Sequence, residues 1–160
     1  MRAISGWIVV FVVLGLNGVA NPQSASPREG SAKQKLLGAW KLAWEEEEGT
    51  DGKMIRSTDH KGTIVYTADG HMSVQIILPR NGEDRRVNNP VTYNQGGYEA
   101  YYGSYDIDEK AHSVTHHVQG SLVPALIGKD LTRVYRFEGN QLILKSSRPD
   151  EHWTIVWEHF

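Results

Sequence analysis

YEAYYGSYDIDEKAHSVTHHVQGSLVPALIGKDLTRVYRF, residues 98–137, decides the fold, because its aromatic and aliphatic side chains recur with the two-residue period of β-strands. Two sets of alternate residues each share one strand face: Val114, His116 and Val118, and Leu131, Arg133, Tyr135 and Phe137. One His and one Arg therefore point among apolar side chains, where a polar group needs a hydrogen-bond partner or a ligand.

Outward from this stretch, the same alternation continues in both directions. Ala68-Asp69-Gly70 separates two alternating apolar runs, 62–67 and 71–78, and an Asp-Gly in that position indicates a hairpin. In the second run we expect the apolar set beginning at Met72 to face the interior. Strands are predicted to begin near residues 39, 62, 71, 103, 113, 131, 141 and 153. We also expect short helices over 31–37, where Ser31 is a cap and Gly38 a stop, and within 91–102.

The first strand carries a charge cluster. Its alternation places Trp40, Leu42 and Trp44 on one face, with Lys41 and Glu45 on the other. The run from Glu45 to Glu48 is therefore expected to be a solvated strand end rather than a cation site, because successive carboxylates point to opposite sides.

Eight hairpin-linked strands without a long crossover favour an all-β fold, an eight-stranded antiparallel up-and-down barrel with a short N-terminal helix. Closure removes the exposed edges that an open sheet would leave. A two-sheet sandwich is the alternative, disfavoured because the turns are short and local. A barrel of eight strands has an interior that side chains fill or that holds one small ligand.

The N-terminal segment is predicted to be a signal peptide. Arg2 is followed by an apolar run and by small residues ending at Ala20, as at a signal-peptidase site. We therefore expect residues 1–20 to be a signal peptide, 21–30 a disordered leader and 31–160 the barrel domain of a soluble periplasmic or secreted protein. An uncleaved membrane anchor is the alternative, although the run is shorter than the roughly 20 residues that span a bilayer.

Composition limits the function. Cleavage near Ala20 moves the formal net charge from −2 to −3, because Arg2 is the only charged residue removed. A mildly acidic chain lacks the excess of positive charge that is typical of nucleic-acid-binding proteins. The chain has no Cys, which excludes disulfides and thiolate catalysis.

Several motifs, in this order, resemble one family. They are Gly38-Ala39-Trp40, GTIVYTADGHMSV from Gly62, Tyr101-Tyr102-Gly103-Ser104-Tyr105, Val114-Thr115-His116-His117-Val118, and Arg133 ahead of Gly139-Asn140-Gln141-Leu142. Together they resemble the lipocalin-like domain family of bacterial and fungal barrel proteins, over roughly residues 36–157. The resemblance implies an eight-stranded lipocalin-like barrel of the calycin type. It implies little about chemistry, because one fold hosts many functions. The predicted leader departs from the family's many leaderless chains, so the resemblance implies no cytosolic role.

The histidines do not form a metal-binding pattern. His116 and His117 are adjacent on a strand and face opposite sides, so they cannot share a metal from inside the barrel. A single interior His could ligate haem, but the chain has no Cys-x-x-Cys-His attachment signal. We expect neither a metal nor another cofactor.

Two interpretations of the inward His and Arg stay open. In the structural one, His116 is hydrogen-bonded to a Tyr and Arg133 stacks on Trp40 at the barrel floor. In the functional one, Arg133 binds a carboxylate or enolate of a ligand while His116 hydrogen-bonds to it or exchanges a proton with it. The predicted ligand-binding residues are Tyr66, Tyr105, His116, Arg133, Tyr135 and Trp157.

Three functions follow from these interpretations. The first is the binding of a small, mostly apolar or amphipathic molecule inside the barrel, beneath an apolar loop at 120–129. The second is a cofactor-free isomerase or cyclase in which His116 and Arg133 are catalytic, so the sequence leaves open whether the chain is an enzyme. The third is a filled barrel that acts on another protein through the polar loop 79–90, which carries Arg80, Arg85 and Arg86.

Overall fold

The computed structural model describes residues 31–49, 51–79 and 91–160. The predicted signal peptide and leader, and the three arginines of the polar loop, lie outside the described residues. No helix within the described part of the chain is both long and apolar enough to cross a membrane.

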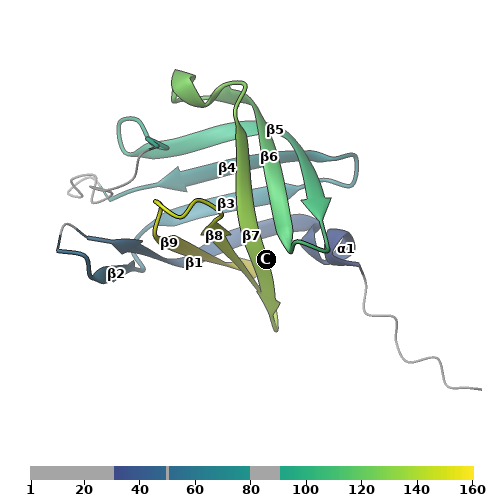
Figure 1. Ribbon diagram of the computed structural model, residues 1–160, viewed down its shortest axis with the longest axis horizontal. Coiled ribbons are helices and arrows are strands. Elements are labelled where there is room, and N and C mark those ends of the chain that lie inside the picture. Colours follow the sequence, from purple (N-terminus) through teal and green to yellow (C-terminus); the bar gives the residue numbers. More distant parts are fainter. Residues whose placement is uncertain (1–30, 50, 80–90) are drawn as a thin grey trace, which may run out of the picture.

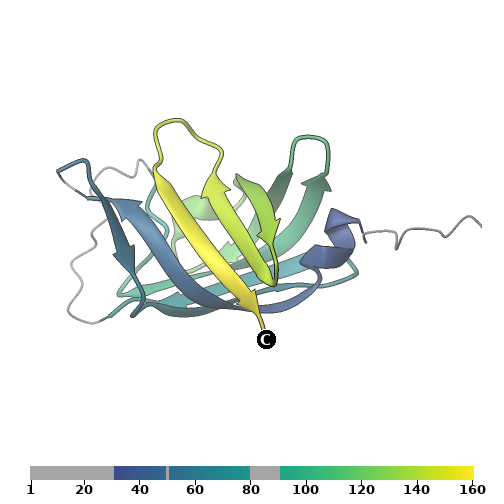
Figure 2. The ribbon, with the colours of Figure 1, turned by 90° about the horizontal axis from the view of Figure 1, so that it is seen from below.

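The described residues form an antiparallel barrel of short connections (Figures 1 and 2). Its elements are α1 (Ala32–Leu36), β1 (Gly38–Glu48), β2 (Met54–Ser57), β3 (Lys61–Tyr66), β4 (His71–Ile77), β5 (Tyr98–Asp108), β6 (Ser113–Ser121), η1 (Pro124–Leu126), β7 (Asp130–Glu138), β8 (Gln141–Ser146) and β9 (Trp153–His159). Strands β1 and β3–β9 pair in chain order, and β9 pairs back onto β1, so eight strands close the predicted up-and-down barrel. Strand β2, which the sequence did not predict, extends the sheet beside the second half of β1.

The two ends of the barrel differ. At one end, here called the helix end, α1 lies beside the β3–β4, β5–β6 and β7–β8 turns (Figure 1). At the other, the loop end, lie η1 and the β8–β9 connection. Figure 1 also shows β7 crossing steeply in front of β3, β4 and β5, so the core lies between two crossing layers.

The predicted N-terminal helix is confirmed, and it closes the helix end. Ser31 Oγ accepts a hydrogen bond from Gln34 N at 3.3 Å, which makes Ser31 the cap. Trp40 Nε1 donates to the carbonyl oxygen of Leu36 at 2.9 Å, and both side chains are buried. The indole therefore satisfies a carbonyl at the end of the helix and joins α1 to the first strand.

A β-bulge overturns the predicted face assignment of β1. The register against β9 shifts between Leu42 and Trp44, so Trp44 turns outward, where the Arg56 guanidinium carbon lies 3.8 Å from its ring centroid. Glu45 turns inward and is only 1% exposed, with Oε2 3.1 Å from His60 Nδ1. The prediction of a wholly solvated acidic strand end is wrong at this residue, because one extra residue in a strand reverses the alternation that follows.

The predicted short helix within residues 91–102 is also wrong. Strand β5 begins at Tyr98, five residues before the predicted start, and pairs with β4 from Ile77 onward. Gly96 and Gly97 both have positive φ, so a turn delivers the chain into the strand. Glu99 disguised the pattern, because it is a buried carboxylate at an inward position where the alternation calls for an apolar residue.

The apolar loop at 120–129 divides into two parts. Val123 and Leu126 are buried in the core, whereas Leu122 and Ile127 are exposed. The loop contains the 3-10 helix η1 and thus covers part of the loop end, as an apolar cover over the interior would.

Candidate functional site

The predicted inward positions of the His and the Arg are confirmed. His116 is 1% exposed and Arg133 is 4% exposed. Among the apolar neighbours on their strand faces, Val114, Val118, Leu131 and Tyr135 are buried, and Phe137 is partly buried. The inward set of β4 is also the predicted one, with Met72, Val74 and Ile76 buried. Strand alternation thus brings one imidazole and one guanidinium into the barrel interior.

Two tyrosines hold His116. The Tyr66 hydroxyl lies 2.8 Å from Nε2, and the Tyr101 hydroxyl lies 3.0 Å from Nδ1. Burial, followed by the nearby Arg133 charge, holds the pKa of His116 well below its ordinary value, so the ring is neutral near pH 7. A neutral imidazole has one N–H donor and one acceptor, so one tyrosine donates to the ring and the other accepts from it.

Both tyrosines are poor acids in this setting. Burial, followed by the influence of Tyr101, raises the pKa of Tyr66 well above its ordinary value. Burial likewise raises the pKa of Tyr101, and the Arg133 charge opposes that shift. Because both ring nitrogens of His116 already have tyrosine partners, acid or base catalysis at this ring would first require a tyrosine to move away.

Arg133 lies close to two aromatic rings. Its guanidinium carbon is 5.1 Å from the ring centroid of Tyr93 and 4.8 Å from that of Trp153. The predicted stacking on Trp40 is wrong, because Trp40 lies at the helix end, beside Phe137 and His159, whereas Arg133 lies toward the loop end. Among the described residues, no carboxylate lies within ion-pair distance of the Arg133 guanidinium.

Glu151 anchors both of these rings. The Tyr93 hydroxyl lies 3.2 Å from each carboxylate oxygen of Glu151, and Trp153 Nε1 donates to Oε2 at 3.3 Å. Ser146 Oγ donates to Oε2 at 2.5 Å, and Arg148 Nε lies 3.4 Å from Oε1. We call Tyr93, Trp153 and Glu151 the aromatic clamp, because a single carboxylate hydrogen-bonds to both rings that contact Arg133.

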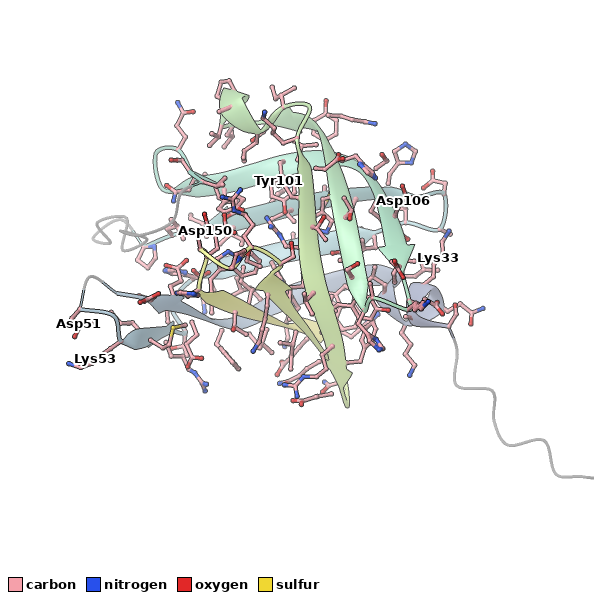
Figure 3. All side chains as sticks on the ribbon, in the orientation of Figure 1. Lys33, Asp51, Lys53, Tyr101, Asp106 and Asp150 are labelled. Atoms are coloured by element: carbon pink, nitrogen blue, oxygen red, sulfur yellow. The ribbon has the colours of Figure 1, made fainter. Side chains whose placement is uncertain are left out.

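A small cavity lies beside the clamp. It measures about 20 Å³, room for about one water molecule. Its polar lining is Glu47, Tyr93, Glu99, Tyr101, His116 and Arg133, and its apolar lining is Ile64, Val74, Ile76, Leu144, Trp153, Ile155 and Trp157. Figure 3 shows Tyr101 among the side chains enclosed by the strands, with Asp150 on the connection above β8 and β9. The interior is therefore an apolar wall around a few converging polar groups.

The other predicted ligand-binding residues are divided between the two ends. Trp157 lines the cavity, and Tyr66 contacts it through His116. The ring of Tyr105 packs 5.0 Å from that of Tyr66, while its hydroxyl donates to the carbonyl oxygen of Thr67 at 3.0 Å. Tyr135 lies toward the helix end, with its ring 5.6 Å from that of Phe137, and it does not line the cavity.

The sequence did not single out Tyr93, Tyr101, Glu99 or Glu151. Tyr101 and Glu99 were missed because they lie in the segment predicted to be a helix. A strand that begins at Tyr98 places both on the same inward face as Tyr105. Tyr93 and Glu151 are buried residues of irregular segments, where no periodicity marks an inward side chain.

The adjacent histidines face opposite sides, as predicted. On the outer surface, His117 Nδ1 lies 2.7 Å from Asp130 and Nε2 lies 3.0 Å from Asp106. In the described ranges, no group of three or more His, Asp or Glu side chains is placed to hold a metal ion.

The fold and interior define a class, the small up-and-down barrels that enclose side chains or a ligand. The chain belongs to the lipocalin-like domain family, whose model matches residues 37–158, so the family resemblance is confirmed.

Solved structures also match this chain, at low identity. A lipocalin-like protein from Bacteroides uniformis is 14% identical over 79% of this chain and 99% of its own, with a TM-score of 0.45. Two mutants of the fluorescent protein UnaG are each 13% identical over 79% of this chain and 96% or 97% of their own, with TM-scores of 0.39 and 0.40. A comparison with curated proteins found no match.

Proposed function

We propose that the protein binds a compact molecule with an apolar body and one acidic group inside the barrel, with the acidic group at Arg133. The observation that carries the proposal is the buried Arg133 guanidinium, which has no carboxylate within ion-pair distance among the described residues. It shares its cavity with seven apolar side chains and with the polar side chains of Glu47, Tyr93, Glu99, Tyr101 and His116. Burial opposes the charge of Arg133, whereas the nearby Tyr101, Tyr93 and Glu99 favour it, and together they raise the pKa of Arg133. A ligand carboxylate would add the bidentate partner that a buried guanidinium favours.

The surroundings of Arg133 set the size of this ligand. A cavity of about 20 Å³ holds a single water, so a ligand enters only when part of the aromatic clamp turns away. Tyr93 and Trp153 line the cavity beside Arg133, and their rings offer apolar surface to a flat ligand body. This geometry favours a small aromatic acid over a long-chain one.

The experiment compares benzoate with benzyl alcohol, which has nearly the same shape without the charge. By titration calorimetry on the protein from residue 21 onward, benzoate should bind at least about tenfold more tightly, the difference one good charged hydrogen-bonding pair supplies. In Arg133→Gln this preference should disappear, and Arg133→Lys should retain part of it. Arg56→Gln, a change of the same kind on the outer face of the barrel, should keep all of it.

Circular dichroism shows whether each variant keeps the β-sheet signal of the wild type. A wild-type barrel that binds both compounds equally, or a folded Arg133→Gln that retains the preference, would contradict the proposal.

The small interior volume favours a second candidate, the filled barrel that acts through its surface on another protein. Side chains occupy nearly all of the space that a ligand would need. If benzoate and related small acids all fail to bind, this candidate replaces the first.

A further inference from the structure

A large hollow on the described surface lies outside the barrel, at the helix end. It is an open groove of about 690 Å³ between α1, the β5–β6 turn and the β7–β8 hairpin, and we call it the lateral groove. Figures 1 and 2 show α1 and the β5–β6 turn side by side, with the β7–β8 hairpin running past them. Its volume is in the range of small-molecule sites, which the interior cavity is not.

The pairing of β7 explains why the groove exists. Strand β6 pairs with β7 only as far as Ser113 opposite Val134, and beyond that point Tyr135 N donates to the carbonyl oxygen of His112 at 2.8 Å. The rest of β7 continues past the β5–β6 turn toward β8. Tyr135 and Phe137, which belong to the inner face of β7, therefore also line a space that opens to the outside.

The groove combines an apolar floor with a positive rim. Val134, Phe137 and Ile143 supply apolar surface. The charged side chains in the lining are Lys35, Arg136 and Lys145 against one carboxylate, Glu109, with His112 beside them. Arg136 Nη1 also lies 2.7 Å from Glu138 Oε1, so Lys145 is the clearest cation for a ligand. A molecule that complements this lining is apolar along its length and negative at one end.

A buried hydroxyl supplies the second, independent observation. Tyr135 is 4% exposed, and its hydroxyl oxygen is buried without a hydrogen-bond partner. Burial, followed by the charges of Glu109 and Asp108, raises the pKa of this hydroxyl, so it stays protonated and is a donor. Tyr135 and Glu109 both belong to the lining of the groove. An unpaired buried donor costs free energy that an incoming acceptor would recover.

We propose that the lateral groove binds one extended amphipathic monoanion, with its chain on Phe137, Val134 and Ile143 and its carboxylate near Lys145 and the Tyr135 hydroxyl. This site is separate from the interior one, because Tyr135 does not line the cavity at Arg133. The two sites also differ in the shape they accept, a long flexible chain here and a compact ring inside.

The test is a ¹H–¹⁵N NMR titration of the protein from residue 21 onward with decanoate, below the concentration at which it forms micelles. Amide shifts should concentrate at residues 134–137, 143–145 and 109–112. Lys145→Glu should weaken binding about tenfold, and Tyr135→Phe about threefold, as expected for a charged and a neutral hydrogen-bonding partner. Decanol should bind the wild type more weakly than decanoate does. Its affinity should be the same for the Lys145→Glu and Tyr135→Phe variants.

Lys41→Glu is the matched control, because it makes the same charge change at a 52% exposed side chain on the outer face of β1. It should alter decanoate affinity less than about twofold, as expected for screened charge. Equal weakening by Lys41→Glu and Lys145→Glu would overturn the proposal, and so would shifts confined to the amides around His116 and Arg133. Binding to phosphatidylglycerol vesicles without any response to monomeric decanoate would also overturn it. Arg133→Gln should leave decanoate binding unchanged, which separates this site from the interior one.

Discussion

His116 and His117 show how one position along a strand changes the chemistry of a side chain. The first is buried between Tyr66 and Tyr101, and burial holds its pKa well below the ordinary value. The second is on the outer surface, and its hydrogen bonds to Asp130 and then Asp106 raise its pKa. The two neighbours therefore contribute to stability with opposite dependence on pH.

For His117, whose pKa is higher in the folded state, the stabilisation is fully present below the unfolded value of about 6.5 and is lost as pH rises through the folded value. His117→Gln should therefore lower the free energy of unfolding at pH 5.5 by roughly 0.5 kcal/mol, a small figure because the pair is solvent-exposed and screened. By pH 9 the variant and the wild type should be alike. Urea unfolding at the two pH values measures the difference. A larger loss of stability at pH 9 than at pH 5.5 would show that the hydrogen bonds with Asp130 and Asp106 do not raise the pKa of His117.

The histidine ring signals provide a direct check on the same prediction. In an NMR titration of the wild type, the His117 signal should shift with a midpoint above about 6.5, while the His116 signal should stay that of a neutral ring well below that pH. An ordinary midpoint for His116 would mean that the ring is hydrated in solution.

Predictions for single residues were confirmed where the two-residue period of a strand alone determines which side a side chain faces. Alternation was enough to turn His116 and Arg133 inward. It gives the side of a strand but not the neighbour across the barrel, which is why the expected Trp40 stacking failed. The true neighbours of Arg133 include Tyr93, which is outside the strands and comes close only when the chain has folded.

Strand β5 carries a steric requirement on the scale of an element. Its register against β6 shifts between Tyr102 and Gly103, and a Cβ built on Gly103 would lie 1.9 Å from the carbonyl oxygen of His117. That atom belongs to the backbone of a paired strand and cannot move without breaking the ladder.

Gly103→Ala should therefore lower the free energy of unfolding by at least about 2 kcal/mol, as overpacking against a fixed neighbour does. Gly70→Ala is the comparison. Gly70 has a φ of 87° but open space around its Cβ position, so that substitution carries only the conformational cost of about 1 kcal/mol. Chemical denaturation of both variants gives the two values, and a Gly103→Ala change no larger than that of Gly70→Ala would mean that β5 and β6 separate more easily than their register indicates.

At the scale of elements, hairpins with local signals were predictable and departures from regularity were not. The turn at Asp69-Gly70, the helix behind Ser31 and the starts of most strands follow from short-range chemistry. The bulge in β1 and the early start of β5 do not follow from such local signals. In both strands a glutamate occupies an inward position, where the alternation of a strand calls for an apolar residue. Those glutamates, Glu45 and Glu99, are buried on the loop-end side of the barrel. The sequence therefore predicted the order of the strands and turns better than the buried polar residues of the interior.

The whole barrel is divided between an apolar half and a polar half. Toward the helix end, Leu36 and Leu142 are completely buried, and Trp40 is buried with them. Toward the loop end, the buried charged residues Glu45, Glu99, Arg133 and Glu151 interrupt the core. Burial of apolar area stabilises one half at about 25 cal/mol per Å², whereas desolvation of charges offsets part of that gain in the other. The half that holds the candidate interior site should be the one that opens more easily.

Hydrogen exchange along a single strand tests this division. Strand β5 runs from the loop end to the helix end and pairs with β4 and β6, so its two halves differ mainly in the core behind them. Amides at 103–107 should exchange at least about tenfold more slowly than those at 98–101, because opening near Arg133 uncovers less apolar surface. Saturating benzoate should slow exchange at 98–101 more than at 103–107, since a carboxylate at Arg133 would relieve the charge burial that weakens that half. Uniform protection along β5 would instead mean that the barrel opens as one cooperative unit and that its buried charges are as well compensated as its aromatic core.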